Sequence, residues 1–235
     1  MTIVSILLFA AITLSLSAAE LAAPRAQDSS KQVPFFLSPA EDTVPQWVRD
    51  ARNNAYNVRP GRPSMIDPEE SGLLPLTVVD FAPQPELPYA ESDVVVVGNI
   101  THLQPFLSTD KKNIYTEYTL KVVEPVKNAV GVPALPGDSL TLLRQGGVAR
   151  FSDGRVVKHE IRNGVEPVPN QRYLVFLRYR PQLDAFVYRK IWLIRNGVMK
   201  AAYPDDLSRE HSGKSEYSGK PLQEVLVTLR DKVKR

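Results

Sequence analysis

Histidines are the first side chains to consider for catalysis or metal binding, because the 235-residue chain contains no cysteine. The three histidines are His102, His159 and His211. None has a second histidine or an acidic residue at metal-ligand spacing on a predicted helix, whereas a zinc site needs three converging ligands. The sequence also lacks the G-x-S-x-G turn that presents a serine nucleophile. We therefore predict no metal site, no cofactor and no catalytic residue.

Paired carboxylates offer another route to catalysis, because many hydrolases place two acids on one cleft. Acidic residues are sparse in the β-rich part of the chain, and most lie beside turns or at outward-facing positions. Gly146-Gly147 precedes a predicted strand and no helix, so it does not indicate a phosphate-binding loop. The sequence predicts a protein that is not an enzyme, with a hydrolase of unrecognised site as one alternative.

One group of arginines and aromatic residues indicates binding. β-Barrels of the OB type bind extended ligands on a strand face with basic and aromatic side chains. Tyr173 and Trp192 lie nearby, although aromatic residues in sheets also serve as core or cross-strand pairs. The predicted binding residues are Arg144, Arg178, Arg180, Arg189, Tyr179 and Tyr188. Because the chain is predicted to be exported, we expect no nucleic acid, which leaves an anionic glycan or a protein as the partner.

These residues lie in a predicted β-barrel that covers residues 90–204. Short apolar or alternating runs separated by glycine turns are typical of an all-β barrel or sandwich. Val94–Val97 is apolar throughout, as in a strand buried on both faces, and Gly98 should end it at a bulge or close backbone contact. We predict an OB-like barrel of about five to seven strands.

The next predicted strand alternates clearly between two faces. Thr116, Tyr118, Leu120 and Val122 share the face that should point into the barrel, and Glu117 lies on the opposite face. The strand-rich segments 172–180 and 186–195 read as a hairpin.

Residues 20–89 form a predicted proline-rich arm, because prolines recur too often for long regular elements. Within it, Thr43 can cap a helix over residues 44–55, and Trp47 is the predicted anchor of that helix on the barrel. Residues 205–235 are predicted to be a flexible connector followed by a helix. The apolar stripe of that helix, which includes Leu222 and Leu226, should dock on the barrel, with binding to a membrane surface as the alternative.

Residues 1–19 resemble a secretory signal peptide, since an uncharged apolar run ends in Ser17-Ala18-Ala19. We expect cleavage before Glu20 and a secreted or periplasmic protein without a stable membrane span, and an uncleaved anchor is the alternative. The protein should be a monomer. Its charge is uneven: residues 20–100 carry 6 basic and 12 acidic side chains, whereas residues 140–200 carry 12 basic and 4 acidic ones. Three interpretations are open: the acidic arm covers the basic face of the barrel, that face meets an anionic partner, or the basic side chains are solvated and block pairing at strand edges.

Four segments carry a resemblance to a known family: DVVVVGNI, YTEYTLKVVEPVKN, GDSLTLLRQGG and NQRYLVFLRY. In this order they resemble the netrin-like OB-fold module of the tissue inhibitors of metalloproteinases, over roughly residues 92–179. The pattern is also similar to that of secreted bacterial proteins without cysteines. The resemblance implies an OB-fold and, as an alternative function, inhibition of an extracellular protease. Those inhibitors use an N-terminal cysteine, which this chain lacks, so none of their functional residues is carried over.

Overall fold

The computed structural model describes residues 44–57, 85–129, 131–150, 156–159, 166–202 and 213–233. The predicted signal peptide, most of the proline-rich arm and the first part of the connector before the last helix lie outside these residues. The described end of that connector, residues 213–219, is tied to the rest of the chain, because the Glu216 amide donates to the Glu86 carboxylate and Tyr217 packs against buried residues.

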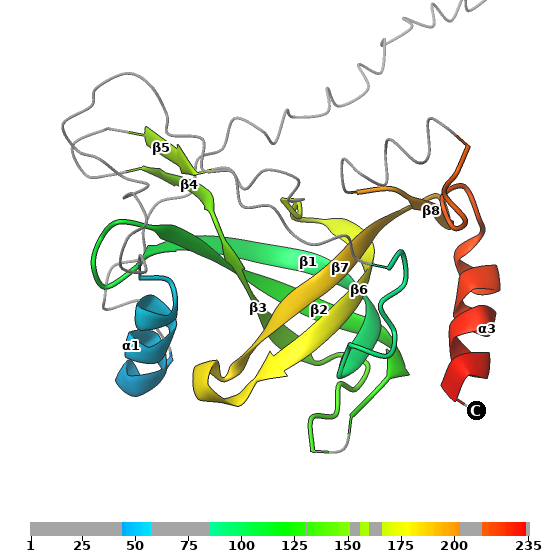
Figure 1. Ribbon diagram of the computed structural model, residues 1–235, viewed down its shortest axis with the longest axis horizontal. Helices are drawn as coiled ribbons and strands as arrows, with labels where there is room; N and C mark the ends of the chain where they lie inside the picture. Colours follow the sequence, from blue (N-terminus) through cyan, green and yellow to red (C-terminus); the bar gives the residue numbers. More distant parts are fainter. Residues whose placement is uncertain are drawn as a thin grey trace, which may run out of the picture. The chain divides into compact units, whose positions relative to one another are not determined.

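Five strands close a barrel (Figure 1). They are β1 (Val94–Leu107), β2 (Ile114–Lys127), β3 (Ser139–Gln145), β6 (Gln171–Arg180) and β7 (Ala185–Arg195). Their order is β3-β2-β1-β6-β7, and a parallel pairing of β3 with β7 joins the ends, while all other neighbours are antiparallel. The fold is an OB-like β-barrel, as the sequence predicts.

Three shorter strands extend this barrel. β4 (Gly147–Arg150) follows β3 after a single residue and pairs with β5 (Val156–His159) as a separate hairpin. β8 (Val198–Lys200) pairs with the end of β7 after the turn at Asn196-Gly197, where both residues have positive φ. The predicted hairpin between β6 and β7 is confirmed, and its turn is a short 3-10 helix, η3 (Pro181–Leu183).

The barrel interior follows the alternation read from the sequence. Tyr118, Leu120 and Val122 of β2 are buried there against inward-facing residues of the other four strands. The run Val94–Val97 is buried on both faces, because Val94 and Val96 point into the barrel and Val95 and Val97 contribute to a second core outside it.

Gly98 confirms one expectation and corrects another. A Cβ atom at this position would lie 2.7 Å from the carbonyl oxygen of Lys121, and the pairing of β1 with β2 shifts between Val97 and Gly98. The predicted close backbone contact is therefore present. The strand does not end there, however, because β1 continues to Leu107. The bulge lets the strand bend and continue around the barrel.

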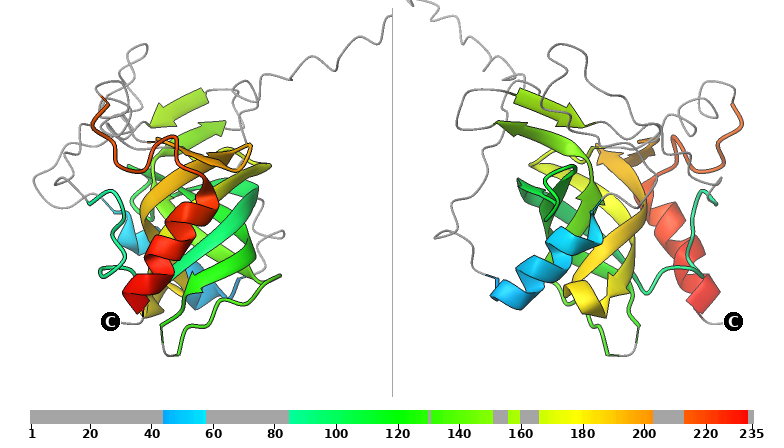
Figure 2. Two further views of the ribbon diagram at one scale, coloured as in Figure 1. Left: turned by 90° about the vertical axis from the view of Figure 1, so that its right-hand side faces the viewer. Right: turned by 60° about the vertical axis from the view of Figure 1, so that its left-hand side comes forward.

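The helix α3 (Leu222–Val233) lies along the barrel wall (Figure 2), and the residues of the second core come from both. The stripe of Leu222, Val225, Leu226 and Leu229 is buried against outward-facing residues such as Trp192. The predicted docking of this helix is confirmed, and its apolar stripe is not open to a membrane surface. No described helix has both the length and the apolar character needed to span a bilayer.

The helix α1 (Gln46–Ala55) forms where the sequence predicts one, but its anchor differs. Trp47 is 63% exposed, so the prediction that it anchors the helix is wrong. The buried residues are Val48, Arg49 and Arg52, and the two arginines meet a carboxylate on the barrel. The face of α1 that docks on the barrel is therefore largely polar. The usual assumption that a helix docks through its most apolar face predicts the wrong face here.

Candidate functional site

The six predicted binding residues lie on both sides of the barrel wall. Successive residues of a strand point to opposite faces. Tyr179 therefore packs with the interior cluster, while Arg178 and Arg180 lie on the outside of β6. Arg144 and Tyr188 also belong to the interior. These six residues thus do not form a single ligand face.

On the inside, Arg144 and Tyr188 come together with residues that the sequence prediction left out. We define the inner cluster as Tyr118, Arg144, His159, Glu166 and Tyr188, which interact electrostatically. Arg144 shares the inward face of β3 with buried leucines and is only 9% exposed. Glu166 is exposed, so the cluster joins a buried cation to an acid at the surface.

Electrostatics keeps the inner cluster in a defined protonation state. Burial acts against the charged form of Arg144, but Tyr188, Tyr118 and Glu166 raise the pKa of its guanidinium, so it stays charged. Burial raises the pKa of Tyr188 to about 12, and that of Tyr118 above its usual range, against the opposing effect of Arg144. Both phenols are therefore neutral hydrogen-bond donors at neutral pH.

His159 is the least satisfied member of the inner cluster. It is 2% exposed, and neither ring nitrogen has a hydrogen-bond partner among the residues that the structure describes. Burial and the nearby charge of Arg144 lower the pKa of His159 to about 4, although the carbonyl of Ile114 acts in the opposite direction. The imidazole is therefore neutral at physiological pH and offers one donor and one acceptor.

On the outside, two of the predicted arginines lie on β6. We call Arg178 and Arg180 the outer arginines. Arg178 is exposed and lies opposite Val187. Arg189 is at the bulge where the pairing of β6 with β7 shifts, and its Nε is buried without a hydrogen-bond partner among the described residues, so it is not one of the outer arginines. Within the described segments Arg178, Arg180 and Arg189 form no ion pair.

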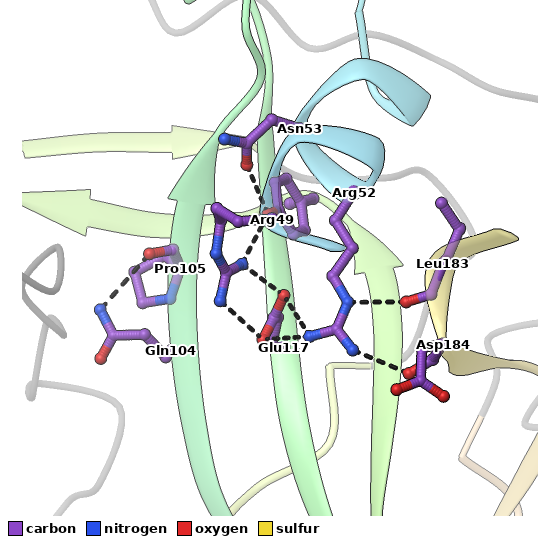
Figure 3. Close-up of polar contacts among 9 residues, drawn as sticks. Arg49, Arg52, Asn53, Gln104, Pro105, Glu117, Leu183 and Asp184 are labelled. Carbon is purple, nitrogen blue, oxygen red and sulfur yellow. Dashed lines mark hydrogen bonds and ion pairs between the residues drawn. The ribbon is translucent and has the colours of Figure 1, made fainter. Parts of the chain in front are cut away.

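The third polar group ties α1 to the barrel (Figure 3). Arg49 donates to the Glu117 carboxylate at 2.6 Å, and Arg52 donates to both of its oxygens at 3.1 Å. Arg52 also donates to the carbonyls of Leu183 and Asp184, and the Arg49 guanidinium lies 3.7 Å from the centre of the Phe106 ring. Glu117 is only 13% exposed, so its expected solvent exposure is wrong. These contacts fill the hydrogen-bonding capacity of Glu117 with structural partners.

The described residues contain no group of three or more His, Asp or Glu side chains that could hold a metal ion. A scan against protein-family models and a search of curated proteins found no match to this chain. The resemblance to the netrin-like module therefore stays a prediction.

Proposed function

We propose that this chain is an exported, non-enzymatic binding protein whose outer arginines contact an anionic partner, either a polyanionic surface component or an acidic patch on a protein. The signal-like residues 1–19 support export. The partner class follows from the charge of the β6–β8 region.

The observation that carries this proposal is the contrast between paired and unpaired arginines. On the α1 side, both Arg49 and Arg52 pair with Glu117. On the outer wall, Arg178 and Arg180 have no carboxylate partner among the described residues, although cationic side chains outnumber acidic ones along residues 166–202 by 7 to 2. A surface with excess positive charge attracts polyanions and speeds their association.

The experiment is heparin-affinity chromatography and calorimetry with Arg178→Glu combined with Arg180→Glu. We expect the double variant to bind heparin at least about tenfold more weakly than the wild type, because each basic residue near an anionic surface contributes about 1 kcal/mol. Wild-type binding should also weaken steeply between roughly 50 and 200 mM salt.

A matched control replaces two exposed lysines elsewhere, with Lys112→Glu combined with Lys121→Glu. This variant has the same net charge as the arginine variant, so it should bind heparin clearly more tightly if position matters. Equal losses in both variants would show that only net charge acts. A drop in thermal stability of the arginine variant alone would instead support coverage of this wall by the protein's own acidic arm.

A further inference from the structure

The helix α1 covers one strand face of the barrel and the two loops beside it. Buried residues of β2, β3, η3 and β7 form one cluster with Ala51 of α1 and with Tyr56, namely Tyr115, Leu143, Leu183 and Ala185. At the turn between β1 and β2, the Thr109 amide donates to the carbonyl of Asn53 at 3.3 Å. OB-type barrels bind ligands on the face of their second and third strands and on the loops that flank it. The chain's own helix therefore occupies the place of a ligand.

Two arginines one turn apart make the main polar contacts of this helix (Figure 3). Arg49 and Arg52 share one side of α1. Glu117 of β2 accepts hydrogen bonds from both, at 2.6 Å from Arg49 and 3.1 Å from Arg52. Two carbonyls of the β6–β7 turn accept from Arg52, and the Arg49 guanidinium lies over the ring of Phe106. Lysine cannot form the same forked hydrogen bonds, so the face is suited to a helix with two arginines three residues apart.

The contact has the composition of an interface between separate proteins. Arginine and tyrosine are enriched in such interfaces, whereas arginine is rarely buried in the core of a domain. The buried residues of α1 are Val48, Arg49 and Arg52, so two of the three are charged. Polar groups that separate regain hydrogen bonds to water, and small polar contacts within a chain allow their parts to move apart. Another helix with the same arginines can therefore replace α1.

We propose that this face binds an arginine-bearing helix of a partner protein, and that α1 keeps the face covered until such a helix replaces it. The partner helix presents two arginines, three residues apart, to the Glu117 carboxylate and to the carbonyls of Leu183 and Asp184. The helix α1 competes as a tethered ligand, because it belongs to the same chain. A cationic helix and a polyanion are opposite in charge, so this inference goes beyond the proposed polyanion binding and does not rest on it.

Fluorescence anisotropy with a labelled synthetic peptide of residues 44–57, capped at both ends, tests this proposal on the full chain. Arg49→Gln combined with Arg52→Gln weakens the resident helix and leaves the face intact. We expect this arginine-to-glutamine variant to bind the peptide with a dissociation constant of about 100 μM or lower. The wild type should bind it at least about tenfold more weakly, because its own helix competes. No binding to the variant up to about 1 mM, or binding no tighter than that of the wild type, would overturn the proposal.

Matched controls locate the contact. Adding Glu117→Gln to the arginine-to-glutamine variant removes the carboxylate that accepts from both arginines, so it should weaken peptide binding at least about tenfold. Adding Glu124→Gln removes another carboxylate of β2 and should change binding by less than about twofold. A peptide with lysine at both arginine positions keeps the charge but loses the forked hydrogen bonds, so it should bind at least about fivefold more weakly. Equal effects of the two added substitutions, or equal binding of the two peptides, would overturn the proposal.

Hydrogen exchange in the wild type provides a second test, which decides even if the arginine-to-glutamine variant does not fold. The peptide at about 1 mM, made with heavy isotopes so that its fragments differ in mass, should speed amide exchange of residues 46–55. Exchange in α3 should not change, because only α1 is replaced. Unchanged exchange of residues 46–55 would overturn the proposal. Heparin binding is measured separately, so a protein that binds heparin without responding to the peptide, or the reverse, shows which of the two proposals fails.

Discussion

Gly147 lies directly against Thr116 at the point where the chain leaves β3 for β4. A Cβ atom at position 147 would lie 2.1 Å from Oγ1 of Thr116, and the φ of Gly147 is 136°. Thr116 cannot easily move away, because it is 1% exposed and its hydroxyl donates to the carbonyl of Gly146 at 2.7 Å. The contact fixes the start of the β4–β5 hairpin on β2.

Gly147→Ala should therefore be strongly destabilising. We expect a loss of about 3 kcal/mol in the free energy of unfolding, from backbone strain together with the clash with Thr116. The control is Gly131→Ala, where φ is 85° but no atom lies within 4 Å of the added Cβ, so strain alone should cost about 1 kcal/mol. Urea denaturation of both variants measures the difference, and equal losses would mean that the clash is relieved by movement.

Glu117→Gln should destabilise the protein by about 3–5 kcal/mol, because it leaves Arg49 and Arg52 buried without their counter-charge. Glu124→Gln is the matched control, since Glu124 pairs with Arg230 at positions that are 34% and 45% exposed. An exposed pair of this kind contributes about 1 kcal/mol or less. Thermal or urea unfolding measures both variants. A small loss of stability in both would show that the buried ion pairs of Glu117 do not stabilise the protein.

Neighbouring residues of α3 provide a test of helix docking. Leu226 is fully buried against the barrel, whereas Val227 is 55% exposed. Leu226→Ala should lower the free energy of unfolding by about 2–5 kcal/mol, and Val227→Ala should change it by no more than about 0.5 kcal/mol. A small effect at Leu226 in urea denaturation would show that α3 is not docked in solution.

His159 should make stability depend on pH. Its folded-state pKa is about 4, below the ordinary value of 6.5, so below pH 6.5 the unfolded chain gains a proton that the folded protein does not bind. Stability should fall as the pH decreases from 6.5 toward 4, by about 2 kcal/mol between pH 7.5 and 5.

This pH effect can be isolated by comparing unfolding at the two pH values in three proteins. The His159→Gln variant should show a much smaller drop in stability between pH 7.5 and 5 than the wild type. His102→Gln, which alters an exposed histidine, should behave as the wild type does. If the His159 variant retained the full pH dependence, other groups would have to be responsible.

The strands were predictable because local patterns determine them. Alternation identified the inward face of β2, and the same rule applied to β3 places Arg144 with Leu140 and Leu142, inside the barrel. Applied to β6, it separates Tyr179 from Arg178. The predicted binding group was chosen by residue type and not by strand face, so it combined residues from the inside and the outside of the barrel.

Other features depend on partners that are distant in the chain. Glu117 points outward from β2 and is buried only because α1 covers it, with Arg52 reaching it from 65 residues away. Trp47 is the only aromatic residue of α1, yet it stays exposed, because the polar surface that the barrel offers to α1 is matched by Arg49 and Arg52. His159 carries no sequence signal at all, because its electrostatic interaction with Arg144 depends on the pairing of β5 with β4, the strand that follows β3.

The parallel pairing of β3 with β7 rests on two residue pairs, Leu142 with Phe186 and Leu143 with Val187. These pairs join segments far apart in the chain, so forming them costs more chain entropy than forming the hairpins and slows closure of the barrel. A molecule in which they have not yet formed presents the edges of β3 and β7, rich in β-branched and aliphatic residues, to other chains. Refolding at high protein concentration should therefore yield strand-exchanged oligomers, whereas dilution gives the closed barrel time to form.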